Sequence, residues 1–342
     1  MSALLDVAGL TRRFHLAHGL FERPRVLTAV DDVSFTLAHG RSLGVVGGSG
    51  SGKSTLARLV MALDEPDAGT VRLDGEDLSA LSPAELRRRR RKFQMVFQDP
   101  RGSLDPRMRV EAIVAEPLDV AEPGLGFARR ERVAAALEAV GLDRSVLRLF
   151  PHQFSGGQRQ RIAIARALVT APALVVADEP VSALDVSIQA QVINLLEDLQ
   201  DELGLTYVTI AHDLSVVRHM SDRVAVMYLG KMVEIADRTP LYERPMHPYT
   251  VALMSAVPIP DTGRRTKRDR IRLEGDVPSP INPPSACRFH TRCWKAQEIC
   301  STVEPPFAEL APGHRVACHF PENLIDLPVP VVRGGNPATP PE

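Results

Sequence analysis

No uninterrupted apolar run in the 342-residue chain approaches the roughly 20 residues that a transmembrane helix needs, because charged or polar residues break every candidate stretch. Charge of one sign is also lacking: 41 lysines and arginines stand against 42 acidic residues, so no global field attracts nucleic acid or anionic lipid. The first residues, Met1 to Asp6, lack the basic and apolar segments of a secretory signal. We therefore expect a cytoplasmic protein that does not span a bilayer and binds no nucleic acid.

Cysteine is scarce and confined to one region of the chain. The four cysteines all lie near the C-terminus: Cys287, Cys293, Cys300 and Cys318. In a reducing compartment this favours metal binding over disulfides. More than half of the 28 prolines also lie beyond Val257, where hydrophobic periodicity fades. We expect residues 258–325 to form a small irregular module rich in cysteine and proline, followed by a frayed tail over residues 326–342.

Short apolar runs alternate with helical patterns through about residue 236, which predicts an α/β fold with a largely parallel sheet. The clearest predicted strands are Ser42 to Val46, Phe93 to Phe97, Leu174 to Ala177, Tyr207 to Ala211 and Arg223 to Tyr228. Residues 103–170 instead carry helical stretches such as Arg129 to Val140, so we expect a helical subdomain inserted into the core. The whole α/β domain is expected to span residues 1–257.

A glycine-rich string follows the first of these strands: Gly47, Gly48, Ser49, Gly50, Ser51, Gly52, Lys53 and Ser54. It matches the pattern G-x-x-x-x-G-K-[ST], and a helical pattern begins directly after it at Thr55. In this context backbone N–H groups cradle phosphates, Lys53 reaches the terminal phosphates and the Ser54 hydroxyl ligates magnesium. The alternative, a plain glycine turn, does not explain a lysine at a helix N-terminus, where the dipole disfavours a cation unless an anion binds. The loop and Thr55 are therefore predicted to bind nucleotide phosphates.

Two adjacent carboxylates end another predicted strand, where the run Leu174 to Ala177 leads into Asp178 and Glu179. Such a pair at the carboxyl edge of a parallel sheet repels itself unless a cation intervenes. We assign Asp178 to the magnesium ion of a bound nucleotide and Glu179 to the attacking water, as general base. An apolar strand that ends in acids is a weak signal alone, and the phosphate loop makes it a strong one.

A third string, Phe154-Ser155-Gly156-Gly157-Gln158, opens a helical pattern. Ser155 suits the N-cap of that helix. Its first turn carries no acid, so the positive end of the helix dipole is uncompensated and favours an anion. An ordinary capped surface helix is the alternative that the serine and glycine alone do not exclude.

In this combination, the glycine loop, the F-S-G-G-Q string and the acid-ended strand resemble the ATP-binding subunits of ABC transporters. The resemblance covers nearly the whole chain and implies a P-loop NTPase core of ABC type. In that family two subunits sandwich two ATP molecules, each between the phosphate loop of one subunit and the signature helix of the other. The resemblance therefore assigns Ser155, Gly157 and Gln158 to the partner's nucleotide, with Phe154 where the family usually has leucine.

The resemblance implies roles for further residues. Gln98, after the strand 93–97, matches the glutamine that senses magnesium, the attacking water and the membrane subunit. His212 matches the histidine that contacts the γ-phosphate and orients the water, although on its own it would be taken for a structural histidine. Phe14 matches the residue that stacks on adenine, and Ser182-Ala183-Leu184-Asp185 matches the loop that crosses the dimer interface.

Four strings narrow the resemblance to the oligopeptide and dipeptide importer branch: Gln94 to Pro100, Leu184 to Gln191, His247 to Thr250 and Gly275 to Pro280. Gly48 departs from that branch, which often has glutamate there. The branch implies ATP hydrolysis at the cytoplasmic face of a bacterial plasma membrane. It also implies a paralogous ATPase partner, two membrane-spanning permease subunits and, indirectly, an extracellular or periplasmic solute-binding protein. Nickel, glutathione or another small solute are the alternative cargoes.

A soluble ABC ATPase of DNA repair or translation is the alternative from another class. Such proteins usually carry a long coiled-coil insert or two tandem ATPase domains, and this chain has neither. A regulatory subunit that binds nucleotide without hydrolysis would be favoured by loss of Glu179 or His212, and both are present.

The four cysteines follow the spacing C-x5-C-x6-C-x17-C. This resembles the C-terminal motif that holds a four-iron four-sulfur cluster in the peptide importer branch, with Trp294 where proline is common. Spacing alone does not separate the cluster from zinc, because four thiolates satisfy either metal. The resemblance implies the cluster, zinc is its main rival, and disulfides are disfavoured in the cytoplasm.

Overall fold

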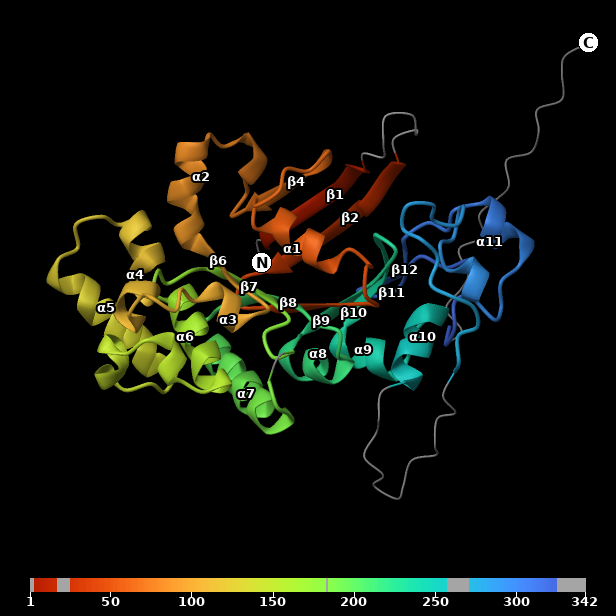
Figure 1. The fold of residues 1–342 in the computed structure, drawn as a ribbon. Helices are drawn as coiled ribbons and strands as arrows, with labels where there is room; N and C mark the ends of the chain where they lie inside the picture. The colour runs from red at the N-terminus through yellow and green to blue at the C-terminus, as the bar shows by residue number, and fades with distance from the viewer. Residues whose placement is uncertain (1–2, 17–24, 183, 257–270, 325–342) are drawn as a thin grey trace, which may run out of the picture.

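The protein is described by a computed structural model that covers residues 3–16, 25–182, 184–256 and 271–324. Its centre is an eight-stranded sheet with the order β11-β12-β10-β9-β3-β8-β7-β6 (Figure 1). The strands are β3 (Ser42–Val46), β6 (Phe93–Val96), β7 (Leu174–Asp178), β8 (Thr206–Ile210), β9 (Arg223–Tyr228), β10 (Lys231–Asp237), β11 (Ala308–Ala311) and β12 (His314–Val316).

Five of these strands, β9, β3, β8, β7 and β6, pair in parallel. They are the five strands that the apolar runs predict, and each run agrees with its strand to within one residue at either end. All five positions of β3, of β7 and of β8 are buried, which is why these strands have continuous rather than alternating apolar sequences. The predicted α/β fold with a largely parallel sheet is confirmed.

A second sheet of four strands is antiparallel and has the order β2-β1-β4-β5. Its strands are β1 (Ala3–Leu16), β2 (Arg25–Ala38), β4 (Ala68–Leu73) and β5 (Glu76–Asp77). Hydrophobic patterning does not predict this sheet. The register of β1 against β2 shifts at several points, and such bulges interrupt the two-residue alternation by which a half-buried strand is found.

Helix α1 (Lys53–Val60) lies between the two sheets (Figure 1). Its buried residues Leu56 and Val60 belong to one core with Leu10 of β1 and Val45 of β3. A second core covers the other face of the central sheet. The phosphate loop at the start of α1 is thus held between two packed layers.

The other helices fall into three groups along the chain. Four lie between β6 and β7: α3 (Pro100–Ser103), α4 (Val110–Ala121), α5 (Phe127–Ala139) and α6 (Gly156–Leu168). Later helices are α7 (Val186–Leu203), α8 (Leu214–Met220), α9 (Arg238–Glu243), α10 (Pro248–Ser255) and α11 (Glu298–Thr302), while α2 (Pro83–Arg89) precedes β6. Short 3-10 turns occur at Leu78–Ala80, Arg90–Lys92, Arg144–Arg148, Pro151–Gln153 and His290–Arg292.

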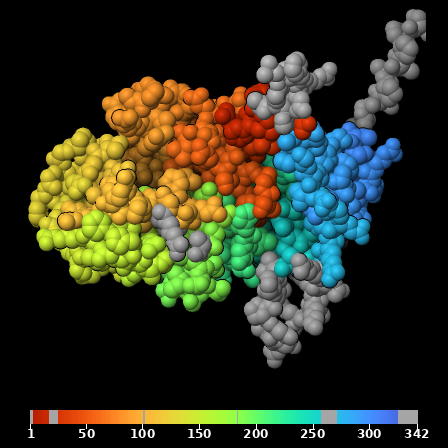
Figure 2. All heavy atoms as spheres, in the orientation of Figure 1, coloured from red at the N-terminus to blue at the C-terminus, as the bar shows by residue number. Residues whose placement is uncertain are grey.

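Residues 271–324 gather at the end of the molecule opposite the helices α4 and α5 (Figure 2). Two of their strands extend the central sheet, because β12 pairs antiparallel with β10 and β11 pairs with β12. The expected frayed tail, residues 326–342, lies outside the described residues. Among the residues that the structure describes, no helix is long and apolar enough to cross a membrane.

Candidate functional site

The glycine loop connects β3 to α1 at the carboxyl edge of the parallel strands. Gly52 is the N-cap of α1 and has a φ of 102°, in the region that favours glycine. A Cβ atom at this position would also lie 2.0 Å from the carbonyl oxygen of Ala29. Only glycine allows the loop to approach β2 this closely while its amides turn toward the space in front of α1.

Lys53 is 4% exposed and folds back over the loop. Its Nζ donates hydrogen bonds to the carbonyl oxygens of Gly47, at 2.8 Å, and Gly48, at 2.9 Å. Burial lowers the pKa of Lys53 to about 8, and the charges of Glu179 and Asp178 oppose that shift. The Lys53 Nζ also donates to the Ser51 hydroxyl at 3.4 Å, so the buried ammonium group has only neutral oxygens as hydrogen-bond partners among the described residues and is poised to bind an anion.

Asp178 and Glu179 stand at the end of β7 and are 8% and 7% exposed. Burial raises the pKa of Asp178, and the charge of Glu179 raises it further. Glu179 has a φ of 47°, which is left-handed for a residue with a side chain, and its amide donates to the carbonyl of Ile210 at 2.8 Å. Backbone strain of this kind is typical of functional positions, and the sequence carries no sign of it.

Three neighbouring strands bring Gln98, Glu179 and His212 together. Gln98 follows β6, Glu179 follows β7 and His212 follows β8, and these strands are adjacent in the sheet. The Gln98 Nε2 donates to Glu179 Oε2 at 2.6 Å, while the His212 Nε2 contacts Glu179 Oε1. Glu179 is therefore held by one side chain on each of its two oxygens.

The residues assigned to magnesium lie within reach of one another. The Ser54 hydroxyl donates to Asp178 Oδ1 at 3.4 Å, across 124 positions of sequence. Hydroxyl and carboxylate oxygens are the ligands that Mg²⁺ prefers, and the buried carboxylate pair gains from a cation. The donor set thus fits magnesium beside the phosphate loop. Gln98 is linked to this set through its hydrogen bond to Glu179, the neighbour of Asp178.

The predicted signature helix is α6, with Ser155 at its N-cap as expected. The Ser155 hydroxyl accepts from the Gln158 amide at 3.3 Å, and the Gln158 side chain accepts from the Ser155 amide at 3.0 Å. Both side chains are exposed, and the first turn has no acid. Within the described part of the chain, no hydrogen bond or ion pair joins these residues to Lys53 or Glu179.

Two positions in the signature string have packing reasons of their own. A Cβ atom at Gly157 would lie 2.5 Å from Cγ2 of Ile188, so this glycine lets α6 approach α7. Phe154 is 7% exposed and belongs to the core on that face of the sheet. An apolar residue is therefore all that this position needs.

Phe14 lies in β1, where the guanidinium carbon of Arg12 is 5.0 Å from the centroid of its ring. In the predicted interface loop, the Ser182 hydroxyl donates to the carbonyl of Glu179 at 3.2 Å and Asp185 is the N-cap of α7. Ala183 lies outside the described residues.

A buried carboxylate that no sequence motif predicted joins the C-terminal residues to the core. Glu234 of β10 is fully buried, and it accepts hydrogen bonds from the amides of Met246, at 2.7 Å, and His247, at 2.9 Å. It also contacts His314 Nε2 of β12 at 2.6 Å. The sequence signal nearest to it is the string His247 to Thr250, which is a marker of the importer branch.

The four cysteines line one small pocket, together with Phe289 and His290. All four thiols are unpaired, and Cys300 is buried. Burial raises the pKa of Cys318 to about 12 and that of Cys287 above its usual value, and in both cases the other cysteines add to the shift. Across the described ranges, no group of three or more His, Cys, Asp or Glu side chains is arranged so that it could hold a metal ion.

Two protein-family models match the chain. Residues 30–182 match the model described as ABC transporter. Residues 233–300 match the model described as oligopeptide/dipeptide transporter, C-terminal region.

Similar proteins extend over nearly the full length. The chain is 52% identical over 319 residues to the oligopeptide transport ATP-binding protein AppF of Bacillus subtilis, which covers 93% of this chain and 97% of the relative. It is also 52% identical over 319 residues to OppF of Haemophilus influenzae, with 92% and 96% covered. A dimeric post-hydrolysis structure of the ATP-binding cassette MJ0796, bound to ADP and Pi, has 31% identity and a TM-score of 0.61 and covers 68% of this chain and 98% of that one.

Proposed function

Because the chain belongs to the ABC transporter family and, within it, to the ATP-binding proteins of oligopeptide and dipeptide transporters, we propose that it hydrolyses ATP to energise peptide import. The observation that carries this proposal is the convergence of Lys53, Ser54 and Asp178 with a carboxylate, Glu179, that is oriented from two sides. These are the parts that phosphoryl transfer to water requires.

Each residue has a definable part in the reaction. Lys53 leaves the carbonyl oxygens of Gly47 and Gly48 and binds the terminal phosphates. Hydrogen bonds to these charged oxygens are stronger than those to neutral carbonyls. Glu179 accepts the proton of the attacking water, and Gln98 and His212 hold its two oxygens so that little reorganisation is needed. Magnesium at Ser54 and Asp178 neutralises phosphate charge when it is bound.

The cargo and the membrane partners follow from the branch to which the chain belongs. As an oligopeptide importer ATPase it works with membrane-spanning permease subunits and a solute-binding protein. The test is to reconstitute these components in liposomes and to measure ATP-dependent uptake of a labelled oligopeptide, with Lys53→Ala as the inactive variant. Peptide uptake supports the proposal, whereas ATP-dependent uptake of nickel or glutathione without peptide uptake would overturn it.

The exposed end of α6 supports a dimer in which Ser155, Gly157 and Gln158 meet the nucleotide of a second ATPase subunit. The cassette structure that aligns with this chain is itself dimeric. We propose that the second subunit is a paralogous chain and that the pair works at the cytoplasmic face of the membrane. Native mass spectrometry of the purified complex tests this. Two copies of this chain with no second ATPase would contradict it.

The domain boundaries and the adenine contact belong to the same proposal. We place the ATPase domain at residues 1–257, its helical subdomain at about 103–170 and the C-terminal module at 258–325. Phe14 stacks on adenine once the Arg12 side chain moves off its ring. This movement breaks the cation–π contact in which the Arg12 guanidinium carbon lies 5.0 Å from the ring centroid.

A metal site is the last part of the proposal. The four cysteines share one pocket, and burial together with the neighbouring cysteines raises the pKa values of Cys287 and Cys318, so a cation would relieve the cost of forming thiolates there. A four-iron cluster is larger than one ion, so its thiolates stand farther apart than those that share a single zinc. We assign Cys287, Cys293, Cys300 and Cys318 to such a cluster. Anaerobic purification with iron, sulfide and zinc analysis decides: about one zinc and no iron per chain rejects the cluster, and no metal rejects the site.

A further inference from the structure

The phosphate loop is held from behind by two hydrogen bonds that play no part in the chemistry described above. The amide of Gly48 donates to the Tyr249 hydroxyl at 2.8 Å. The amide of Gly230, in the turn between β9 and β10, donates to the carbonyl of Ser51 at 2.9 Å. Both partners lie far from the loop in sequence, so the shape of the loop depends on how Tyr249 and Gly230 are themselves held.

Tyr249 belongs to a cluster of three buried aromatic rings, and the other two hold it in place. Its ring centroid lies 4.7 Å from that of Tyr228 and 5.4 Å from that of Phe289. Tyr228 and Phe289 meet edge to face at 5.3 Å, and all three residues are under 5% exposed. Burial raises the pKa of Tyr249 to about 12, so the neutral hydroxyl accepts the Gly48 bond throughout the physiological range.

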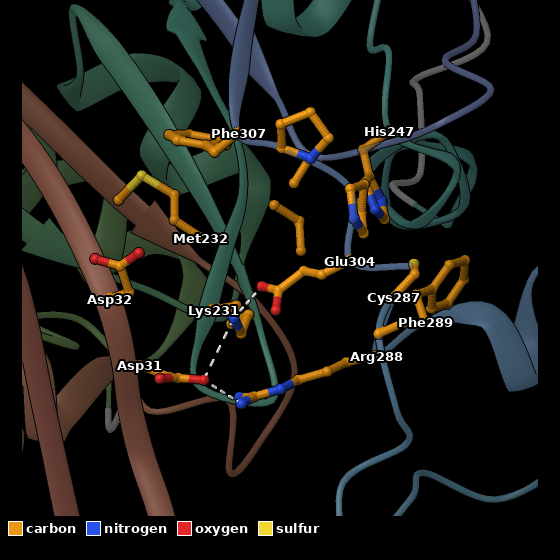
Figure 3. A pocket seen from close by; sticks show the side chains of 15 residues that line it. Asp31, Asp32, Lys231, Met232, His247, Cys287, Arg288, Phe289, Glu304 and Phe307 are labelled. Carbon is orange, nitrogen blue, oxygen red and sulfur yellow. Dashed lines mark hydrogen bonds and ion pairs between the residues drawn. The ribbon is translucent and has the colours of Figure 1, made fainter. Parts of the chain in front are cut away.

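The turn at Leu229 and Gly230 is held by the residue that precedes Phe289. Arg288 donates to the carbonyl of Leu229 and also pairs with Asp31 of β2. Figure 3 shows Arg288 reaching toward Asp31, which also pairs with Lys231, at the edge of a cavity of about 230 Å³. Asp31 donates its own amide to Gly230 at 2.9 Å, which ties the turn to β2 as well.

Arg288 therefore contacts one support of the loop, the turn at Leu229 and Gly230, and Phe289 contacts the other, Tyr249. Arg288 and Phe289 are the two residues that follow Cys287, which lines the pocket of the four cysteines. We propose that Arg288, Phe289 and Tyr249 are positioning residues through which the C-terminal module sets the shape of the phosphate loop and hence the affinity for ATP. This inference rests on the proposed function, because it takes the loop as the ATP site.

The absence of a side chain at Gly48 agrees with this arrangement. A Cβ atom there would lie 3.3 Å from the Tyr249 hydroxyl, closer than ordinary packing. Glycine at this position leaves room for the hydrogen bond between its amide and the Tyr249 hydroxyl.

The test is Tyr249→Phe in the full chain, with AMP-PNP and magnesium titrated by calorimetry. The ring remains and only the acceptor for the Gly48 amide is lost, so we expect the Kd to rise about three- to tenfold, a share of the cost of an unmade buried hydrogen bond. In the assembled transporter the KM for ATP should rise similarly, with kcat changed less than about twofold, because the loss affects ground-state and transition-state binding alike. An unchanged Kd would overturn the inference, whereas a wild-type chain that binds no nucleotide would overturn the proposed function instead.

The matched control is Tyr207→Phe, which removes a hydroxyl from another buried tyrosine, of β8, that has no hydrogen-bond partner among the residues that the structure describes. Its Kd should stay at the wild-type value. Phe289→Leu tests transmission from the C-terminal module: it should raise the Kd, and the double variant with Tyr249→Phe should show less than the product of the two effects, because both act along one path. A product of independent effects, or a Phe289→Leu variant with wild-type affinity, would show that the module does not act through Tyr249.

Discussion

The side-chain amide of Gln98 donates to one carboxylate oxygen of Glu179 across 2.6 Å, and this bond joins the ends of the adjacent strands β6 and β7. With His212 on the other oxygen, the carboxylate has one orientation before any nucleotide arrives. A base that is positioned in advance needs little reorganisation during the reaction.

Replacement of this base should separate ATP binding from hydrolysis. Glu179→Gln keeps the shape of the side chain and removes one negative charge, so ATP binding should remain and the closed dimer should gain stability. Steady-state ATPase activity of the assembled transporter should fall by at least about a hundredfold, the scale of losing a positioned catalytic group. Glu202→Gln, at an exposed position of α7, is the control. Wild-type ATPase activity in the Glu179 variant would refute the assignment.

The signature helix can be tested without loss of its cap. Ser155→Asp keeps a good N-cap residue but places a carboxylate where the partner's phosphates are proposed to bind. Nucleotide binding by the single chain should persist, while ATPase activity of the assembled transporter should fall by about tenfold or more through charge repulsion. Ser82→Asp makes the same change at the N-cap of α2 and should have no effect. Equal activities of the two variants would argue against a role for α6 at the dimer interface.

Nucleotide affinity should fall as the pH rises through about 8. The pKa of Lys53 is lowered to about 8 in the free protein by burial, and bound phosphates must raise it again. ATP binding therefore takes up a proton above that pH, and the Kd should rise by nearly tenfold for each further pH unit until the pKa of the bound state is reached. Calorimetry in two buffers of different ionisation enthalpy measures the uptake. A constant Kd between pH 7 and about 9.5 would contradict it.

The attachment of β12 and α10 to the core should depend on one carboxylate. Glu234→Ala leaves His314 and two amides without their buried partner, so the free energy of unfolding should fall by about 3–5 kcal/mol. Urea denaturation measures this loss, and Glu243→Ala, an exposed position in α9, is the control. Similar midpoints for the two variants would mean that the buried network contributes no stability.

Local sequence patterns predicted those elements whose conformation depends on a single short segment of the chain. The phosphate loop at Gly47 to Ser54 follows from glycine spacing and from the strand before it, and Ser155 is the N-cap that its sequence favours. The strands β3, β7 and β8 are buried at every position, so their apolar runs were clear. The antiparallel sheet of β1 and β2 was not predicted, because its bulges hide the alternation that would identify it.

By itself the sequence determined the order of the parallel-strand elements, the loop that follows β3 and the acids that end β7, because backbone conformation and burial at these sites depend on neighbouring residues. Only the tertiary structure decided that Gln98 and His212 grip Glu179, that Glu234 is shared by β10, α10 and β12, and that Tyr249 supports Gly48. The bonds Gln98–Glu179, Glu234–His314 and Gly48–Tyr249 join residues that are 81, 80 and 201 positions apart. They form only when sheets and helices pack in three dimensions.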